Sequence, residues 1–266
     1  MEEYALKEQA ACFLQQNFRV SIGELEKAAY PFSAVELLDP TRCSHIMKLQ
    51  SRQLEDPGDI VVGTLFAKRY AVLFMGLVSA VSLFDCRLAT APENVEFRIT
   101  SLAAMEYQVR IAEQPSLPVC EMEQRKVEVE KWIDRLLQHT EMILEAVSSR
   151  TGAKVNMMWS LISNYVQNSY VHLEQNADVW RTEQRLQLIL ADRSILLEQR
   201  KGNPLAVSFR KFHHPQYEGA PIVLRRHCCL AYRLRREGLQ LHGYCSTCPK
   251  IGDKERLDLL GYGANT

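Results

Sequence analysis

Four cysteines near the C-terminal end of this chain have the residue type and the spacing to bind a metal. They lie at positions 228, 229, 245 and 248, in the pattern C-C-x15-C-x2-C, and are half of the eight cysteines. Thiolates gathered in one short stretch favour a thiophilic centre, either zinc or an iron–sulfur cluster. Cys245 and Cys248 can turn their sulfurs toward one metal from a tight turn. Pro249 follows them, as a proline does in some ferredoxin cluster motifs.

The adjacent pair Cys228 and Cys229 is the unusual half of the pattern. Structural zinc sites normally use spaced pairs, C-x2-4-C, in both halves. Neighbouring residues tend to point their side chains apart, so an adjacent pair chelates a lone ion poorly, whereas a cluster with two irons is larger and accommodates it more readily. The spacing therefore favours a two-iron cluster, and it does not reveal which iron each cysteine would bind.

The residues around these cysteines resemble the C-terminal signature of FhuF-type ferric siderophore reductases. In that family the motif is C-C-x10-C-x2-C, whereas the middle spacer here, residues 230–244, is fifteen residues long. The rest of the chain matches loosely, mainly at residues 158–164. The matching residues of the signature are Arg226, Cys228, Cys229, Tyr232, Arg233, Cys245, Cys248 and Pro249.

The resemblance implies a [2Fe-2S] cluster on the four cysteines and an oxidoreductase that uses it. The implied reaction is one-electron reduction of siderophore-bound Fe(III) to Fe(II), which releases the iron in the cytoplasm. The substrate would be a ferric siderophore of the hydroxamate or citrate-hydroxamate type. Arg226, Tyr232 and Arg233 belong to the matching signature and are the candidates for roles beside the cluster.

The source of electrons is expected to be another molecule, because the chain carries no nucleotide-binding fingerprint. Gly261 and Gly263 lie at the extreme C-terminal end with no helix to follow, so they do not form a dinucleotide loop, and there is no P-loop. We therefore expect an external electron donor: a ferredoxin, a flavoprotein or a small reductant.

Two other functional classes stay open. The cysteines could staple the C-terminal segment as a structural zinc module of a protein that only binds partners. The protein could also be a non-catalytic iron–sulfur electron carrier or sensor, although a simple carrier would be smaller. Nucleic-acid binding is disfavoured, because 32 Lys and Arg balance 32 Asp and Glu and no DNA-reading helix lies in a basic domain.

The cellular compartment is inferred from the cysteines and from the start of the chain. The first residues have no basic region followed by an apolar run, so we expect no signal peptide. A chain of 266 residues with 47% hydrophobic residues can bury a substantial core without a disulfide framework. We therefore expect a reducing cytoplasm, where clustered thiols indicate metal or redox chemistry.

Basic residues gather around the cysteines and form what we call the basic cap. Between residues 205 and 250 the acids are only Glu218 and Glu237. Cations near an anionic cluster stabilise its reduced form, and they could attract an anionic ferric chelate. The basic cap consists of Arg210, Lys211, Arg225, Arg226, Arg233, Arg235, Arg236 and Lys250.

Hydrophobic periodicity predicts an α+β, mainly α fold. We expect a mainly helical siderophore-binding body over residues 1–204 and a cysteine-rich cluster-binding segment over 205–266, packed on the body. Alternation with period two predicts a small antiparallel β element from strands at 95–99 and 105–111, ended by Pro115 and Pro118, and 205–209 is a further strand candidate. Helices are expected at 1–19, 60–84, 121–150, 155–174 and 178–200.

The most apolar stretch, residues 60–84, bears on the membrane question. Its uncharged part, 70–84, is fifteen residues long, whereas a span needs about twenty. We therefore expect a buried core helix and no transmembrane segment, with a peripheral membrane contact kept as an alternative.

The four cysteines outside the motif have no metal spacing, and we expect none of them to be a ligand. Cys12 is expected to be a small core residue. The others are Cys43, Cys86 and Cys120.

Overall fold

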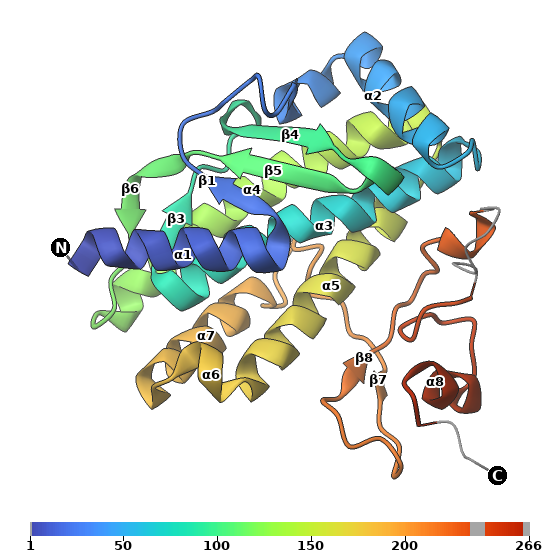
Figure 1. Ribbon diagram of the computed structural model, residues 1–266. Helices are drawn as coiled ribbons and strands as arrows, with labels where there is room; N and C mark the ends of the chain where they lie inside the picture. Colours follow the sequence, from blue (N-terminus) through green and yellow to red (C-terminus); the bar gives the residue numbers. More distant parts are fainter. Residues whose placement is uncertain (1, 235–242, 263–266) are drawn as a thin grey trace.

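The computed structural model describes residues 2–234 and 243–262, and it confirms a mainly helical α+β fold (Figure 1). The helices are α1 (Glu2–Phe18), α2 (Pro40–Gln53), α3 (Asp59–Phe84), α4 (Met122–Thr151), α5 (Val155–Gln175), α6 (Ala177–Trp180), α7 (Glu183–Leu196) and α8 (Asp253–Leu259). The strands are β1 (Val20–Ile22), β2 (Phe32–Ser33), β3 (Cys86–Leu88), β4 (Val95–Ile99), β5 (Met105–Val109), β6 (Ile111–Ser116), β7 (Lys211–Phe212) and β8 (Ile222–Val223).

Helix α3 is the centre of the body, and α1, α4, α5 and α7 all pack against it. It is apolar on every side, which is the pattern of a helix surrounded by protein, and most of its side chains are buried. The end of α4 packs closely against α3 at Gly63, because a Cβ added to this glycine would lie only 2.1 Å from Thr151 Oγ1. By length and composition alone α3 could cross a membrane, but 72% of its most apolar window is buried inside the protein.

The sheet element lies on one side of α3 and α4 (Figure 1). The predicted strand pair is confirmed, because β4 and β5 form an antiparallel ladder in which Phe97 faces Tyr107. β2 adds antiparallel to β4, and β1 adds parallel to β5, which gives the order β1-β5-β4-β2. Pro115 does not end the sheet, since it lies within β6, which pairs with β3.

The helices after the sheet follow the sequence prediction up to residue 175. Helix α4 ends at Gly152, which has φ 72° and so occupies the left-handed conformation that glycine tolerates best. The expected single helix over 178–200 is wrong, because it is broken into α6 and α7. Arg181 adopts a left-handed conformation, and Thr182 then caps α7 by accepting a hydrogen bond from the Arg185 amide.

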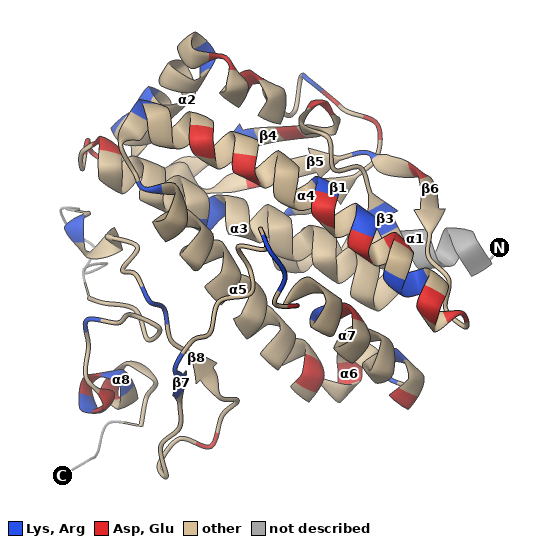
Figure 2. Cartoon of the chain, turned by 180° about the vertical axis from the view of Figure 1, so that it is seen from behind, with Lys and Arg blue, Asp and Glu red and all other residues tan. Residues whose placement is uncertain are grey.

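The C-terminal segment has little regular structure. The strand predicted at 205–209 is not formed; a two-residue ladder of β7 with β8 lies just beyond it. In Figures 1 and 2 the segment runs beside α5 and ends with the short helix α8. The cysteines therefore sit on loops whose shape is set by what they pack against.

A buried ion network joins the ends of three helices in the body. The guanidinium of Arg125 on α4 is 1% exposed and binds both carboxylate oxygens of Asp192 on α7. It also binds Asp85, at the end of α3, at 2.6 Å, and Arg185 binds the same aspartate from the other side. Each buried charge thus has an opposite partner, which is the condition for keeping charges inside a protein.

We predict that Arg125→Met lowers the free energy of unfolding by about 3–5 kcal/mol, because it leaves two buried carboxylates without their common partner. Urea denaturation followed by circular dichroism measures this loss. The control is Arg98→Ala, which removes an exposed pair with Glu106 and is expected to cost less than about 1 kcal/mol. Similar losses in both variants would show that the network does not stabilise the fold.

Candidate metal centre

The structure brings the four motif cysteines together as two pairs. The sulfurs of Cys228 and Cys248 are 3.7 Å apart, and Cys229 and Cys245 share a hydrogen bond. Each pair takes one member from the adjacent half of the motif and one from the C-x2-C half. Within residues 2–234 and 243–262, no three His, Cys, Asp or Glu side chains gather as ligands of one ion.

Short-range main-chain contacts fix both halves of the motif. The Cys248 amide donates to the Cys245 carbonyl at 2.8 Å, which closes the C-x2-C turn. The Arg225 amide donates to the Thr247 carbonyl at 3.0 Å and so ties the two halves together. Arg256 of α8 is fully buried and donates to the carbonyls of Cys248 and Ile251. The turn is thereby held from both sides.

Helix α5 holds the segment against the body with a row of polar side chains. Ser163 donates to the Leu205 carbonyl at 2.7 Å, and Gln167 donates to the Val207 carbonyl at 2.8 Å. Hydrogen bonds of this kind satisfy the backbone of a segment that has few ladder bonds of its own.

Two asparagines of the same helix hold the next part of the segment. Asn164 and Asn168 donate to the Val223 carbonyl, and Asn168 also accepts from the Val223 amide at 2.9 Å. This contact lies five residues before Cys228 and anchors the approach to the adjacent cysteines.

The Cys229–Cys245 pair lies in a buried, cationic environment. The hydrogen bond from Cys245, with Arg225 and Lys68 nearby, lowers the pKa of the Cys229 thiol to about 4 despite its burial. The same hydrogen bond, together with burial, raises the pKa of Cys245. The hydrogen bond therefore favours a thiolate on Cys229 and a proton on Cys245, and a metal would displace that proton.

Three cations face this pair, two of them from the central helix. Arg225 donates a hydrogen bond to Cys245 Sγ. Burial lowers the pKa of Lys68, but Tyr165 and the thiolates of the pair outweigh it and the net shift is upward. Burial also lowers the pKa of Arg69 to about 10, and Tyr107 and Cys229 oppose that shift. All three groups stay positively charged at neutral pH.

The Cys228–Cys248 pair has a different environment, although it also combines one half-buried and one buried thiol. Burial raises the pKa of Cys228, and the Leu230 amide donates to its sulfur at 3.4 Å. Exposed cations stand beside this pair, on the ring of Tyr232. Lys250 lies 4.5 Å and Arg233 5.9 Å from the centre of that ring. We call Tyr232, Arg233 and Lys250 the outer platform.

The residues singled out from the sequence take different positions. Arg226 is exposed and donates to the Ser208 carbonyl, so it faces away from the sulfurs. Arg233 is exposed above the half-buried Tyr232, and the hydrogen bond from Lys250 lowers the pKa of the Tyr232 phenol. Of the basic cap, Arg235 and Arg236 lie outside the described residues. Figure 2 shows that Lys and Arg recur along the segment with β7, β8 and α8.

The cysteines outside the motif lie on different elements of the fold. Cys43 and Cys86 are buried, whereas Cys12 and Cys120 are exposed. The expectation that Cys12 is a core residue is wrong, because α1 turns Leu14 and Phe18 toward α3 and leaves Cys12 on its outer face.

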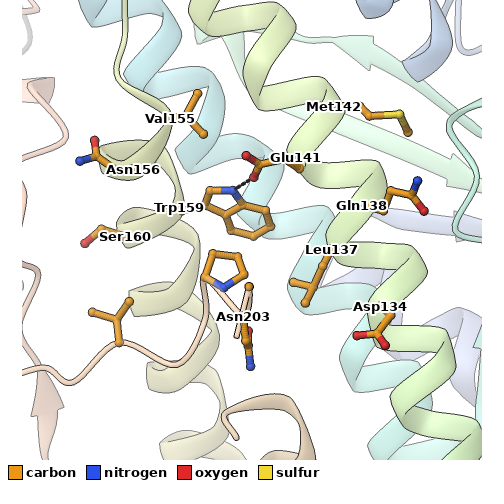
Figure 3. A pocket seen from close by; sticks show the side chains of 13 residues that line it. Asp134, Leu137, Gln138, Glu141, Met142, Val155, Asn156, Trp159, Ser160 and Asn203 are labelled. Carbon is orange, nitrogen blue, oxygen red and sulfur yellow. Dashed lines mark hydrogen bonds between the residues drawn. The ribbon is translucent and has the colours of Figure 1, made fainter. Parts of the chain in front are cut away.

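A separate cavity of about 860 Å³ lies between α4, α5 and residues 202–207 (Figure 3). The Trp159 indole forms one wall and donates a hydrogen bond to the Glu141 carboxylate. Its charged lining residues are the acids Asp134 and Glu141. The cavity is therefore unsuited to an anionic ferric chelate.

Comparison with models of known protein families gave no match, and comparison with curated proteins gave none.

We predict that Ala substitution of each cysteine outside the motif leaves the metal content per chain unchanged, because none of them lies in either sulfur pair. Cys229→Ala and Cys245→Ala, in contrast, should bind markedly less metal. Elemental analysis and the absorption spectrum measure both. Loss of metal from a folded Cys12, Cys43, Cys86 or Cys120 variant would mean that a ligand has been misassigned.

Proposed function

We propose that the protein is a ferric siderophore reductase that binds a [2Fe-2S] cluster on Cys228, Cys229, Cys245 and Cys248. The observation that carries the proposal is that the four thiols form two close pairs, each of which joins the two halves of the motif. A two-iron cluster takes four cysteine thiolates, which is the number that the two pairs supply together. The resemblance of the motif to the FhuF-type signature supports the same centre.

The surroundings of the thiols fit an anionic cluster. Four thiolates carry a large negative charge, and Arg225, Lys68 and Arg69 are placed to compensate part of it. Two nitrogens of the buried Arg225 side chain have no acceptor among the described residues, so they are available to a further anionic group. A structural zinc ion on four thiolates would carry the same net charge as the oxidised cluster, without the further negative charge that the cluster gains on reduction. It would also need four sulfurs around a single point.

The bound cluster would transfer one electron at a time, at a site from which the protein partly excludes water. One thiol of each pair is covered, since Cys229 is 1% exposed and Cys248 is fully buried. The outer platform offers exposed positive charge near the half-buried Cys228, where an anionic ferric chelate can approach. Ferric iron that accepts one electron becomes ferrous iron, which oxygen ligands hold more weakly.

The electrons are proposed to come from an external ferredoxin, flavoprotein or small reductant, and the reaction is placed in the cytoplasm. A non-catalytic carrier or sensor is the second candidate, because the same cluster could serve it. The exposed outer platform beside the thiols favours a reductase over a carrier or sensor, because it suits a small anionic substrate. A structural zinc protein is the third candidate.

We predict that natively purified protein is red-brown and contains about two iron and two sulfide per chain, because four thiolates complete a [2Fe-2S] centre. Anaerobic purification, iron and sulfide analysis and the visible spectrum test this. Stoichiometric zinc in colourless protein would replace the reductase by the structural zinc module.

We further predict that chemically reduced protein is reoxidised by a ferric citrate-hydroxamate chelate and yields ferrous iron. An anionic chelate should react faster than a cationic one, and the preference should weaken with salt, since exposed charges are screened beyond roughly 8–10 Å. Stopped-flow absorbance at two ionic strengths, with a ferrous-specific chelator, measures both effects.

The outer platform provides the variants for this experiment. Arg233→Ala and Lys250→Ala should reduce the preference for the anionic chelate, whereas Lys131→Ala, an exposed lysine of α4, should not. Arg226→Ala tests whether the signature arginine contributes although it faces Ser208. If ferric chelates leave the reduced protein untouched, the carrier or sensor replaces the reductase; if reoxidation is fast but indifferent to charge, only the platform's role is refuted.

A further inference from the structure

The buried guanidinium of Arg225 is the side chain most closely joined to the thiols. It is 3% exposed, and its Nη2 donates to Cys245 Sγ. The main chain of the same residue bonds the Thr247 carbonyl, so its backbone position is fixed relative to the C-x2-C turn. From the sequence alone, Arg225 is one member of the basic cap and is not distinguished from the others.

Arg225 also has hydrogen-bonding capacity to spare. Its Nε and Nη1 are buried and have no acceptor in the described part of the chain. A buried donor that lacks an acceptor is costly, and more so when it is charged. Arg256, the other buried arginine of the segment, likewise has no acceptor for Nε and Nη1 in the described part of the chain, but its Nη2 donates to two main-chain carbonyls and its guanidinium faces the Phe212 ring at 5.5 Å. Arg225 differs because its bonded nitrogen meets a thiol sulfur, so its spare donors lie beside the thiols.

Cations face both pairs of thiols. Arg225 and Lys68 interact with the Cys229–Cys245 pair, from the segment and from α3 respectively. The other pair has the exposed, water-screened Lys250 near Cys228 and the buried Arg256 near Cys248, where Arg256 donates to the Cys248 carbonyl. Of these four side chains, Arg225 donates directly to a thiol sulfur.

We propose that Arg225 is a positioning residue that holds the Cys229 and Cys245 thiolates and raises the reduction potential of the bound cluster. The inference rests on the proposed function, because it assumes that a cluster is bound. In the step concerned, one electron arrives from the external donor and later leaves to ferric iron. Arg225 keeps its proton throughout, and no bond to it forms or breaks. Hydrogen bonds to cluster sulfurs and nearby positive charge are known means of raising such potentials.

The structure separates this role from that of the neighbouring residue. Arg226 carries the same charge one position later, but its side chain is exposed and bonds the Ser208 carbonyl. If net charge alone raised the reduction potential, removing an exposed arginine of the segment would lower the potential as much as removing Arg225. If the buried, hydrogen-bonded guanidinium raises it, only the loss of Arg225 would lower the potential.

The test is the midpoint potential of iron-loaded protein, measured by redox titration with visible and electron paramagnetic resonance spectra. At the wild-type midpoint, Arg225→Gln should lower the ratio of reduced to oxidised protein about tenfold, which is about 59 mV for one electron. Arg225→Lys should give a smaller shift, because it keeps the charge and loses the forked donor. The control is Arg210→Gln, which removes an arginine that is 66% exposed, and it should give no shift.

The outcomes distinguish this inference from the proposed function. If wild-type protein contains no iron and sulfide, the proposed function fails and the inference fails with it. If wild type and Arg225→Gln both hold the cluster at the same potential, the proposed function stands and the inference is overturned. If Arg225→Gln does not fold or load, Arg225→Lys replaces it: a downward shift of the midpoint potential supports the inference, and an unchanged potential overturns it.

Discussion

Two neighbouring cations inside the most apolar helix of the protein place a constraint on everything around them. Lys68 and Arg69 lie on α3, which is otherwise surrounded by hydrophobic side chains. A desolvated charge is tolerated only beside an opposite charge or strong hydrogen-bonding partners. Anionic or hydrogen-bonding groups therefore have to come to α3 at this level, and they are the Tyr107 and Tyr165 phenols and the thiols of Cys229 and Cys245. The thiol site lies where these groups meet the two cations.

The site that results has two unlike sides. On one side, Cys229 and Cys245 meet Arg225 and Lys68, and the body buries Cys229. On the other side, Tyr232 and Lys250 present an aromatic ring and an exposed charge next to Cys228. A centre built in this way can keep one face at low dielectric, where charges interact strongly, while the other remains accessible. Electron transfer to a bulky chelate needs both properties.

The sequence predicted the regular parts of this structure and missed the irregular ones for identifiable reasons. Helices α3, α4 and α5 and the β4–β5 hairpin have clear hydrophobic periods, and they lie where those periods placed them. The break at Arg181 has no glycine or proline to announce it. The segment after residue 204 has no period, so nothing in the sequence distinguished the buried Arg225 from the exposed Arg226. The pairing of cysteines depends on the same loop geometry and was equally out of reach.

The row of hydroxyl and amide groups on α5 makes the last part of the chain resemble a bound peptide. Side chains of α5 donate hydrogen bonds to the main-chain carbonyls of residues 205, 207 and 223, much as a receptor binds an extended peptide. The donors are Ser163, Asn164, Gln167 and Asn168. A tether of a few residues gives such a ligand an effective concentration on the order of millimolar. Modest intrinsic affinity is then enough to keep it seated. The C-terminal segment therefore carries the thiols to a binding surface on α5, and this surface is formed by residues that are synthesised before the segment.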